Sequence, residues 1–276
     1  MPFENSSASS FSEAINRGFS KQSIGYDEAD RSNIILLDLR HQVYKHVEQY
    51  LSPDSYILEL NAGTGLDAHY FVSKGHRVHA TDLADGMVNQ IRLKISSSDH
   101  SDRFTCQQVS FANLDTITTR NFDCVFSNFG GLNCIQDLSL VSRHLPSLIK
   151  PGGHVTWVIM PPVCPGELLW ILKGNFSKAL RRLGKNGTLA HVAGEHFPTY
   201  YHSLKNVRSA LGSSFKLLRS EGLAALSPQP HLSKFASIHP GIYKLLRRTD
   251  AFLKDRFPFN RWADHIIVTF QYRPEQ

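Results

Sequence analysis

The sequence predicts an α/β fold, a doubly wound seven-stranded sheet with helices on both faces and a lid insertion after the fifth strand. Three observations lead to this prediction. Short apolar runs of strand length alternate with amphipathic helical segments between residues 56 and 160. A glycine-rich turn follows the first strand, and Pro-Gly-Gly at 151–153 closes the helix before the fifth. Because crossover helices pack back onto the sheet, such alternation indicates parallel strands.

Each element is predicted from its apolar pattern. Strands are expected at 56–60, 77–81, 104–109, 122–127, 154–160, 215–218 and 265–272, and helices at 30–51, 84–95, 136–149, 204–211 and 242–253, with a further helix ending at 74. In the first helix Ile34, Leu37, Val43 and Val47 recur at helical spacing amid charges. We therefore expect these four side chains to face the core.

The chain is expected to divide into an arm and one domain. Residues 1–24 are rich in serine and weakly patterned, so we expect a flexible arm with one short helix near 11–16. Residues 25–276 then form the domain. After residue 161 the alternation stops, and residues 165–213 and 223–262 fit insertions above the sheet better than further strand–helix units.

Composition excludes several classes of protein. The chain has 276 residues, 41% hydrophobic and 20% charged, which is typical of a globular protein and not of a disordered or coiled-coil chain. No apolar run reaches the roughly 20 residues that span a bilayer, and the N-terminus lacks a secretory pattern, so we expect a cytoplasmic protein. Its four cysteines stand singly, which predicts reduced thiols and no zinc site.

The net charge of +6 is mildly basic, and the cations are mixed with acids over most of the chain. This alone is a weak argument for nucleic acid, and we do not expect a nucleic-acid partner. Two stretches, 173–185 and 244–256, are locally basic and have helical apolar spacing. We interpret both as solvated helix faces over a buried stripe rather than as binding patches.

The turn after the first strand carries the chemical signal. Gly63, Gly65 and Ala68 match the pattern GxGxxA between a strand and a helix, and Asp82 ends the second strand. Such a turn lets a ligand approach the backbone, with the N–H groups of the helix pointing at it. Both a nicotinamide dinucleotide and S-adenosylmethionine fit this pattern. The alternative is a tight turn, with Asp82 capping the next helix.

Neighbouring residues favour S-adenosylmethionine. Glu59 near the strand end would repel a pyrophosphate but suits the cationic part of a sulfonium amino acid. The Asp82 carboxylate can accept both hydroxyls of a ribose, while Leu83 and Met87 offer apolar cover for adenine.

The layout resembles a class I S-adenosylmethionine-dependent methyltransferase, of the broad type that acts on small molecules. The pieces that carry the resemblance are LELNAGTG, ATDLADGM, FDCVFSNFGGLNC and LIKPGGHVTWVIM, and it covers roughly residues 24–160. It implies a Rossmann-like sheet and no metal. The resemblance further implies a set of site residues: Glu59, Asn61, Gly63 and Gly65 for the methionine moiety, Asp82 for the ribose, Leu83 and Met87 for the adenine, Ser110 and Phe111 for its edge, Tyr26 with Asp27 for the start of a lid, and Asn128 beside the methyl group.

The sequence departs from the family pattern at two positions. The family usually has glycine where Asn61 stands, and often an acid where Ser110 stands. Asparagine tolerates a positive φ better than most residues, and a serine hydroxyl can still meet an adenine amine, so we expect binding to be preserved.

Acceptor-side candidates follow the fourth and fifth strands. The loop 128–133 is expected next to the methyl group, with Asn133 as a helix cap in the alternative reading. Glu167, His196, Tyr200 and His202 are candidate catalytic residues, because histidine is the usual base near neutral pH. Aromatic and apolar residues of the lid favour a hydrophobic or aromatic small-molecule acceptor.

Three other functions stay open. A nucleic-acid methyltransferase that methylates amino groups has an Asn/Asp-Pro-Pro-aromatic loop after the fourth strand, where this chain reads Asn-Phe-Gly-Gly at 128–131. The Pro-Pro-Val-Cys run at 161–164 resembles the nucleophile loop of a cytosine-C5 methyltransferase only superficially, because it follows the fifth strand. A non-catalytic cofactor-binding module is a further alternative, and a nicotinamide dehydrogenase ranks last.

Overall fold

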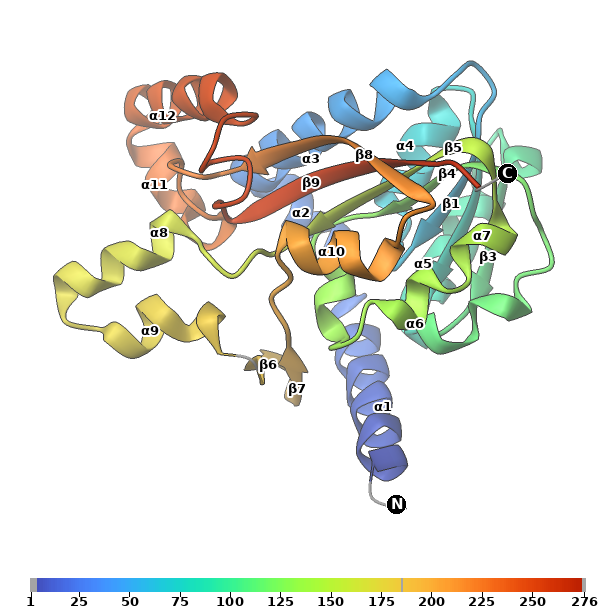
Figure 1. The fold of residues 1–276 in the computed structure, drawn as a ribbon, viewed down its shortest axis with the longest axis horizontal. Coiled ribbons are helices and arrows are strands. Elements are labelled where there is room, and N and C mark those ends of the chain that lie inside the picture. The colour runs from blue at the N-terminus through green and yellow to red at the C-terminus, as the bar shows by residue number, and fades with distance from the viewer. Residues whose placement is uncertain (1–3, 185, 275–276) are drawn as a thin grey trace.

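The computed structural model describes residues 4–184 and 186–274 (Figure 1). The strands are β1 (Tyr56–Leu60), β2 (Arg77–Asp82), β3 (Phe104–Gln108), β4 (Phe122–Ser127), β5 (Ile149–Ile159), β6 (Thr188–Val192), β7 (Glu195–Thr199), β8 (Phe215–Leu223) and β9 (His265–Tyr272). The α-helices are α1 (Glu4–Gln22), α2 (Tyr26–Ser32), α3 (Ile34–Val47), α4 (Leu66–Ser73), α5 (Asp85–Ser96), α6 (Ser139–Ser142), α7 (Leu145–Leu148), α8 (Pro165–Leu168), α9 (Phe176–Leu180), α10 (Leu204–Leu211), α11 (Ser233–Ile238) and α12 (Pro240–Leu253). The 3-10 turns are η1 (Glu48–Tyr50), η2 (Ser101–Arg103), η3 (Phe111–Thr116), η4 (Gly131–Cys134), η5 (Leu169–Lys173), η6 (Arg181–Leu183) and η7 (Pro230–Leu232).

Seven strands form one sheet in the order β3-β2-β1-β4-β5-β9-β8, which confirms the predicted doubly wound sheet. Strands β1 to β5 are parallel. This confirms the parallel arrangement expected for the alternating segment 56–160, whereas β9 runs antiparallel to both β5 and β8. Parallel strands end at the same edge of the sheet, so the turns after β1, β2, β3 and β4 lie together there.

Helices cover both faces of the sheet, as predicted. On one face the core joins α3, α4 and α11 to the sheet, with Phe71 and Phe126 at its centre. On the other face α6, α7 and α10 pack over Trp157 and Phe122. Because both faces are covered, β1 and β4 are apolar almost throughout rather than alternating.

Two helices differ from their predicted form. The helix expected over 30–51 divides at Asn33, whose side chain caps α3, and the buried stripe of α3 includes Ile35, Leu39 and Val43. Ile34 and Leu37, which were expected to face the core, are exposed. The helix expected over 136–149 is two short helices, and β5 begins at Ile149, so it includes the Pro-Gly-Gly sequence.

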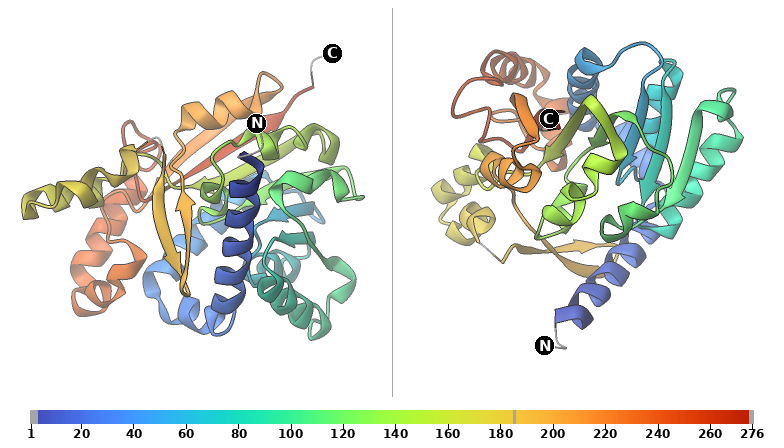
Figure 2. Two further views of the ribbon diagram at one scale, coloured as in Figure 1. Left: turned by 90° about the horizontal axis from the view of Figure 1, so that it is seen from below. Right: turned by 45° about the vertical axis from the view of Figure 1, so that its right-hand side comes forward.

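Residues 4–22 of the N-terminal arm form one helix with tertiary contacts, longer than the short helix expected near 11–16. Helix α1 lies beside the β6–β7 hairpin in Figure 2, and Phe19 packs on Phe197 with ring centroids 5.6 Å apart. Arg17 and Lys21 both pair with Glu195 of the hairpin. The serine-rich sequence concealed this helix because its partner surface comes from residues far along the chain.

The segment between β5 and α10 contains the hairpin, which the sequence did not predict, and the short helices α8 and α9. The description of residues 165–213 and 223–262 as a lid stays a prediction. Within the described residues, no helix has both the length and the apolar character needed to cross a membrane.

Candidate functional site

The glycine-rich turn leaves β1 in a backbone form that favours glycine. Gly63 has φ +58° and Gly65 has φ +81°, both in the left-handed region. Asn61 has φ +46°, so it takes the conformation expected for the residue that replaces the usual glycine. At Gly63 no atom lies within 4 Å of the position that a Cβ would take, so a ligand can approach the turn there.

Asp82 joins this turn to the start of α5. Its Oδ2 accepts the N–H of Gly63 (2.8 Å) and its Oδ1 accepts the N–H of Ala84 (2.9 Å). Burial raises the pKa of Asp82 to about 6, although these backbone bonds oppose the shift. Asp82 therefore fixes the turn and the helix start, as in the capping alternative, while each oxygen keeps a further lone pair for a ribose hydroxyl.

Asn61 links the ends of β1 and β4. Its amide donates to the carbonyl of Asn128 (2.9 Å) and accepts from the hydroxyl of Ser127 (2.6 Å). A Cβ on Gly131 would collide with this amide, at 2.2 Å from its Cγ. The side chain of Asn61, expected at the methionine moiety, thus positions the 128–131 loop.

Glu59 is the buried acid near the end of β1. Its side chain is buried, with 1% of the residue exposed, and its Oε2 has no hydrogen-bond partner among the described residues. Burial raises the pKa of Glu59 well above its usual value, and the nearby charge of Asp67 adds to the shift. A buried, unpartnered carboxylate oxygen costs free energy unless a cation meets it.

A buried charge network beside Glu59 was missed by the sequence analysis. Asp67 of α4 accepts from Arg40, from the hydroxyl of Tyr44 (2.6 Å) and from the amide of Asn128 (2.7 Å). Arg40 also pairs with Asp30 at 2.6 Å. One signal was present in the sequence, because Arg40 interrupts the apolar stripe of its helix between Leu39 and Val43.

Helix α2 lies against the glycine turn, where the sequence places the start of a lid. The hydroxyl of Thr64 donates to Asp27 (2.5 Å), and Lys94 of α5 pairs with the same carboxylate (2.6 Å). Tyr26 is half-buried, and burial raises its pKa while the charge of Arg40 opposes the shift. Asp27 therefore connects α2 to the turn and to α5.

The residues expected around adenine follow β2 and β3. Leu83 and Phe111 are partly exposed, and the Ser110 hydroxyl accepts the N–H of Ala112 at 3.3 Å. Met87 lies on the buried face of α5 with 2% of its surface exposed. This burial places Met87 in the core, whereas the sequence suggested it as apolar cover for adenine.

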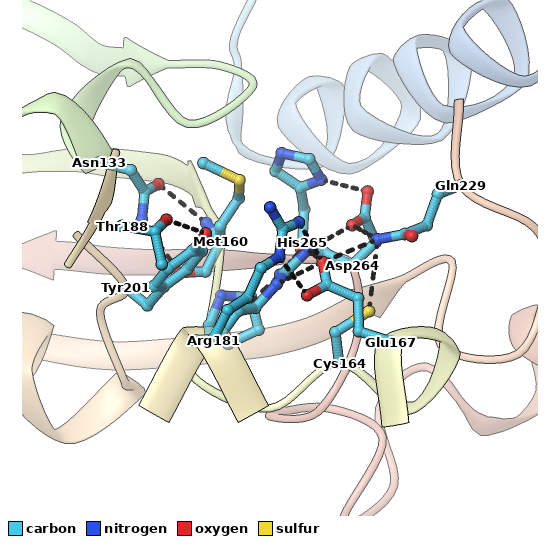
Figure 3. Close-up of polar contacts among 12 residues, drawn as sticks. Asn133, Met160, Cys164, Glu167, Arg181, Thr188, Tyr201, Gln229, Asp264 and His265 are labelled. Carbon is cyan, nitrogen blue, oxygen red and sulfur yellow. Dashed lines mark hydrogen bonds and ion pairs between the residues drawn. The ribbon is translucent and has the colours of Figure 1, made fainter. Parts of the chain in front are cut away.

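Asn133 connects three loops on the acceptor side. It is fully buried and accepts the N–H of Met160 (2.9 Å), while its amide donates to the carbonyls of Met160 (3.0 Å) and Tyr200 (2.5 Å). The backbone of Tyr200 in turn donates to the carbonyl of Asn133 (2.7 Å). The loops after β4, β5 and β7 therefore meet at one amide, part of which is visible in Figure 3.

Glu167 is not a free base, contrary to its place among the catalytic candidates. Arg181 binds both of its carboxylate oxygens at 2.7 Å, and Arg182 bridges it to Asp264 (Figure 3). Burial alone would raise its pKa, but the two guanidinium groups lower the pKa of Glu167 to about 2. A carboxylate with this pKa is a poor proton acceptor near neutrality, so Glu167 is an ion-pair residue.

The two candidate histidines lie in different surroundings. The Nε2 of His202 lies 2.9 Å from the carbonyl of Ile135, which can only accept, so this nitrogen carries the proton. Burial lowers the pKa of His202 below its usual value. His196 is exposed and stacks on His191 with centroids 4.6 Å apart, on the hairpin face opposite Phe197. His202 thus positions the loop after β4, whereas the His196 ring is open to solvent.

Comparisons with known proteins fit this geometry. Residues 57–153 match the model of a methyltransferase domain family. Residues 57–153 are therefore a methyltransferase domain. This confirms the resemblance inferred from the sequence. A search of curated protein sequences finds no significant match.

Solved structures of SAM-dependent methyltransferases share the fold of this chain. A SAM-dependent methyltransferase from Methanosarcina mazei has 16% identity and a TM-score of 0.55, covering 83% of this chain and 97% of that one. One from Mesorhizobium loti has 15% identity and a TM-score of 0.52, covering 83% and 96%. The CcbJ methyltransferase from Streptomyces caelestis has 16% identity and a TM-score of 0.55, covering 86% and 90%. At these identities the likeness establishes the fold alone.

The carboxyl edge of the sheet has residues whose chemistry fits S-adenosylmethionine. The unpartnered Oε2 of Glu59 can receive the ammonium of a methionine moiety, and the open space at Gly63 admits a ligand to the turn. Asp82 lies at the end of the neighbouring strand, with lone pairs left for hydroxyl groups. One edge of the sheet thus offers Glu59 for the ammonium group, the open turn at Gly63 for close approach of the ligand, and Asp82 for the ribose.

Proposed function

We propose that this chain binds S-adenosylmethionine and transfers its methyl group to a small, hydrophobic or aromatic acceptor. The observation that carries the proposal is the unpartnered Oε2 of Glu59 beside an open glycine turn, within the segment that matches the methyltransferase family. S-adenosylmethionine is the cofactor. When bound, it supplies a methyl group already activated by the sulfonium charge.

The chain's own residues bind and orient the cofactor. Glu59 pairs with the ammonium group, Asp82 accepts from the ribose, and Leu83 covers the adenine. Asn61 acts indirectly, through its bonds to the 127–128 backbone and hydroxyl. The pair of Arg40 and Asp67 holds Asn128 in place, because Asp67 accepts from the amide of Asn128 and from Arg40.

The acceptor binds beside the loop after β4. Phe129, Met160 and Tyr200 are only partly buried there, and each comes from a different connection. Gly130 lies directly against Met160, and Phe129 has φ +43°, a strained form for a residue other than glycine. These apolar groups favour a hydrophobic or aromatic acceptor, and their main contribution to the reaction is alignment and exclusion of water.

If the acceptor must lose a proton, His196 takes it. Glu167 and His202 are bound to other groups, whereas the His196 ring has no hydrogen bond among the described residues. Cys164 is not a nucleophile, because burial raises its thiol pKa to about 11. We place the reaction in the cytoplasm, with a small molecule rather than nucleic acid as the partner.

The deciding experiment incubates the protein and methyl-labelled S-adenosylmethionine with a small-molecule extract and, separately, with nucleic acid, and follows the label by mass spectrometry. We expect a labelled small molecule. A labelled nucleic acid would show the alternative activity. Calorimetric binding of the cofactor without any labelled product across both pools would show a non-catalytic binding module.

A further inference from the structure

Residues 165–183, which we call the projecting segment, leave the body of the molecule after β5. They comprise α8, η5, α9 and η6. In Figure 1 this segment extends to the left, away from the sheet, and it stays at the margin of the molecule in both views of Figure 2. Its anchor is the pair of ion pairs from Glu167 to Arg181 and Arg182. The part between α8 and η6 is therefore presented outward.

The projecting segment exposes large apolar side chains, so the buried apolar stripe expected for residues 173–185 is wrong for their described part. The exposed ones are Leu169, Ile171, Leu172, Phe176, Leu180 and Leu183. Leu172 exposes 84% of its surface and Phe176 exposes 59%. Single exposed apolar residues are ordinary, but six within fifteen residues of chain indicate a surface that another phase or molecule covers.

Apart from Glu167, which pairs with Arg181 and Arg182 at the base, the charges of the projecting segment are all positive. Residues 168–184 contain no Asp or Glu, but they contain Lys173, Lys178, Arg181 and Arg182. The ammonium groups of Lys173 and Lys178 lie 5.0 and 3.7 Å from the ring centroid of Trp170. Lysines with long apolar stems around a tryptophan are typical of protein surfaces at the boundary between lipid headgroups and acyl chains.

We infer that the projecting segment docks this protein onto an anionic lipid bilayer. Leu172 and Phe176 enter the boundary between headgroups and acyl chains, and Lys173 and Lys178 face the anionic headgroups. The segment lies on the membrane rather than crossing it, since each of its helices is a turn or two long. This inference does not depend on methyl transfer.

A second copy of the chain is a poorer occupant than a bilayer. In a two-fold dimer the same patch meets itself, which brings Lys173 and Lys178 toward their own copies. No acid between residues 168 and 184 offsets that repulsion. An anionic bilayer supplies both the opposite charge and the apolar phase.

Helix α12 adds a second surface of the same kind. Ile242, Leu245 and Phe252 are exposed on it, together with Lys244 and Arg248. In Figure 1 both α12 and the projecting segment lie on the left side of the molecule, and they remain on one side in the right-hand view of Figure 2. Contact through both segments would orient the molecule on the membrane.

The test is co-sedimentation of the full chain with vesicles of phosphatidylcholine alone or mixed with phosphatidylglycerol. We expect binding to the mixed vesicles that weakens as salt is added, and little binding to phosphatidylcholine. Leu172→Ser with Phe176→Ser should lower the partition coefficient about tenfold or more. Lys173→Gln with Lys178→Gln should lower it about tenfold on mixed vesicles only.

The matched control is Leu93→Ser on α5. Leu93 exposes 61% of its surface, close to the 62% of Leu169, but α5 packs on β2 and β3 at the other end of the sheet. Its binding should equal that of the unchanged protein. The inference is overturned if the unchanged protein ignores mixed vesicles, or if gel filtration shows a dimer that Leu172→Ser dissociates. Thermal unfolding of each variant checks that it is folded.

Discussion

The carboxylate of Asp82 accepts the backbone N–H of Gly63 over 2.8 Å, so one side chain at the end of β2 fixes the turn at the end of β1. The same carboxylate binds the N–H of Ala84 at the start of α5. A single acid therefore orders two of the loops that face the proposed cofactor. Its substitution should affect ligand binding before it affects the sheet, since the strands themselves do not use it.

Asp82→Asn keeps an oxygen for the Gly63 N–H but removes the charge. We expect S-adenosylmethionine binding to weaken by roughly 1.5–3 kcal/mol, because charge-assisted bonds to the ribose are lost. Calorimetry on the folded variant measures this. Asp85→Asn is the matched control, because Asp85 is exposed three residues further on. Equal affinity of both variants would contradict the ribose assignment.

Cofactor binding should release a proton from Glu59. Burial raises its pKa well above the usual value, so in the free protein it holds a proton to a higher pH, and a bound ammonium group favours the ionised form. Affinity should therefore increase as the pH rises through that pKa. Calorimetry in buffers of different ionisation enthalpy counts the released protons. Glu59→Gln should abolish the proton release that comes from Glu59. Glu221→Gln should leave the proton count unchanged, since ion pairing already holds the pKa of Glu221 at about 2 despite its burial.

Glu167 should stabilise the fold above acidic pH. Its pKa of about 2 lies below the ordinary 4.5, so its contribution is present above pH 4.5 and is lost as the pH falls toward 2. Glu167→Ala should lower the free energy of unfolding by about 3 kcal/mol at pH 7, because the buried Arg182 loses one of its two carboxylate partners. Urea unfolding at pH 7 and at low pH measures this. The cost should shrink at low pH, and exposed Glu28→Ala should change little at either; an equal cost for Glu167→Ala at both would contradict the ion-pair account.

His196 and His191 form a matched pair for testing the base. They face each other across the hairpin, so either change to alanine removes the same ring stack. Once the acceptor is known, His196→Ala should lower kcat by about 10²–10⁴ while cofactor affinity stays the same. His191→Ala should leave kcat close to that of the unchanged enzyme. If the two variants behave alike, transfer proceeds by alignment onto an already ionised acceptor.

The sequence by itself determined the seven strands of the main sheet and the glycine turn, because these depend on local pattern. Strand β1 was predicted to the residue, and the turn after it requires the left-handed backbone that Gly63 and Gly65 allow. The parallel crossovers then bring the ends of β1 and β2 to one edge. The placement of Glu59 and Asp82 there follows from topology alone.

Only the tertiary structure decided which polar groups are free to act. Glu167 looked like a candidate base until Arg181 and Arg182, fourteen and fifteen residues further on, were seen to bind it. Helix α1 of the arm is held against the hairpin by contacts with Glu195, which lies more than 170 residues away in the sequence. Pairings between distant residues leave no periodic pattern in the sequence, and burial, which sets the charge of a side chain, is a property of the packed fold.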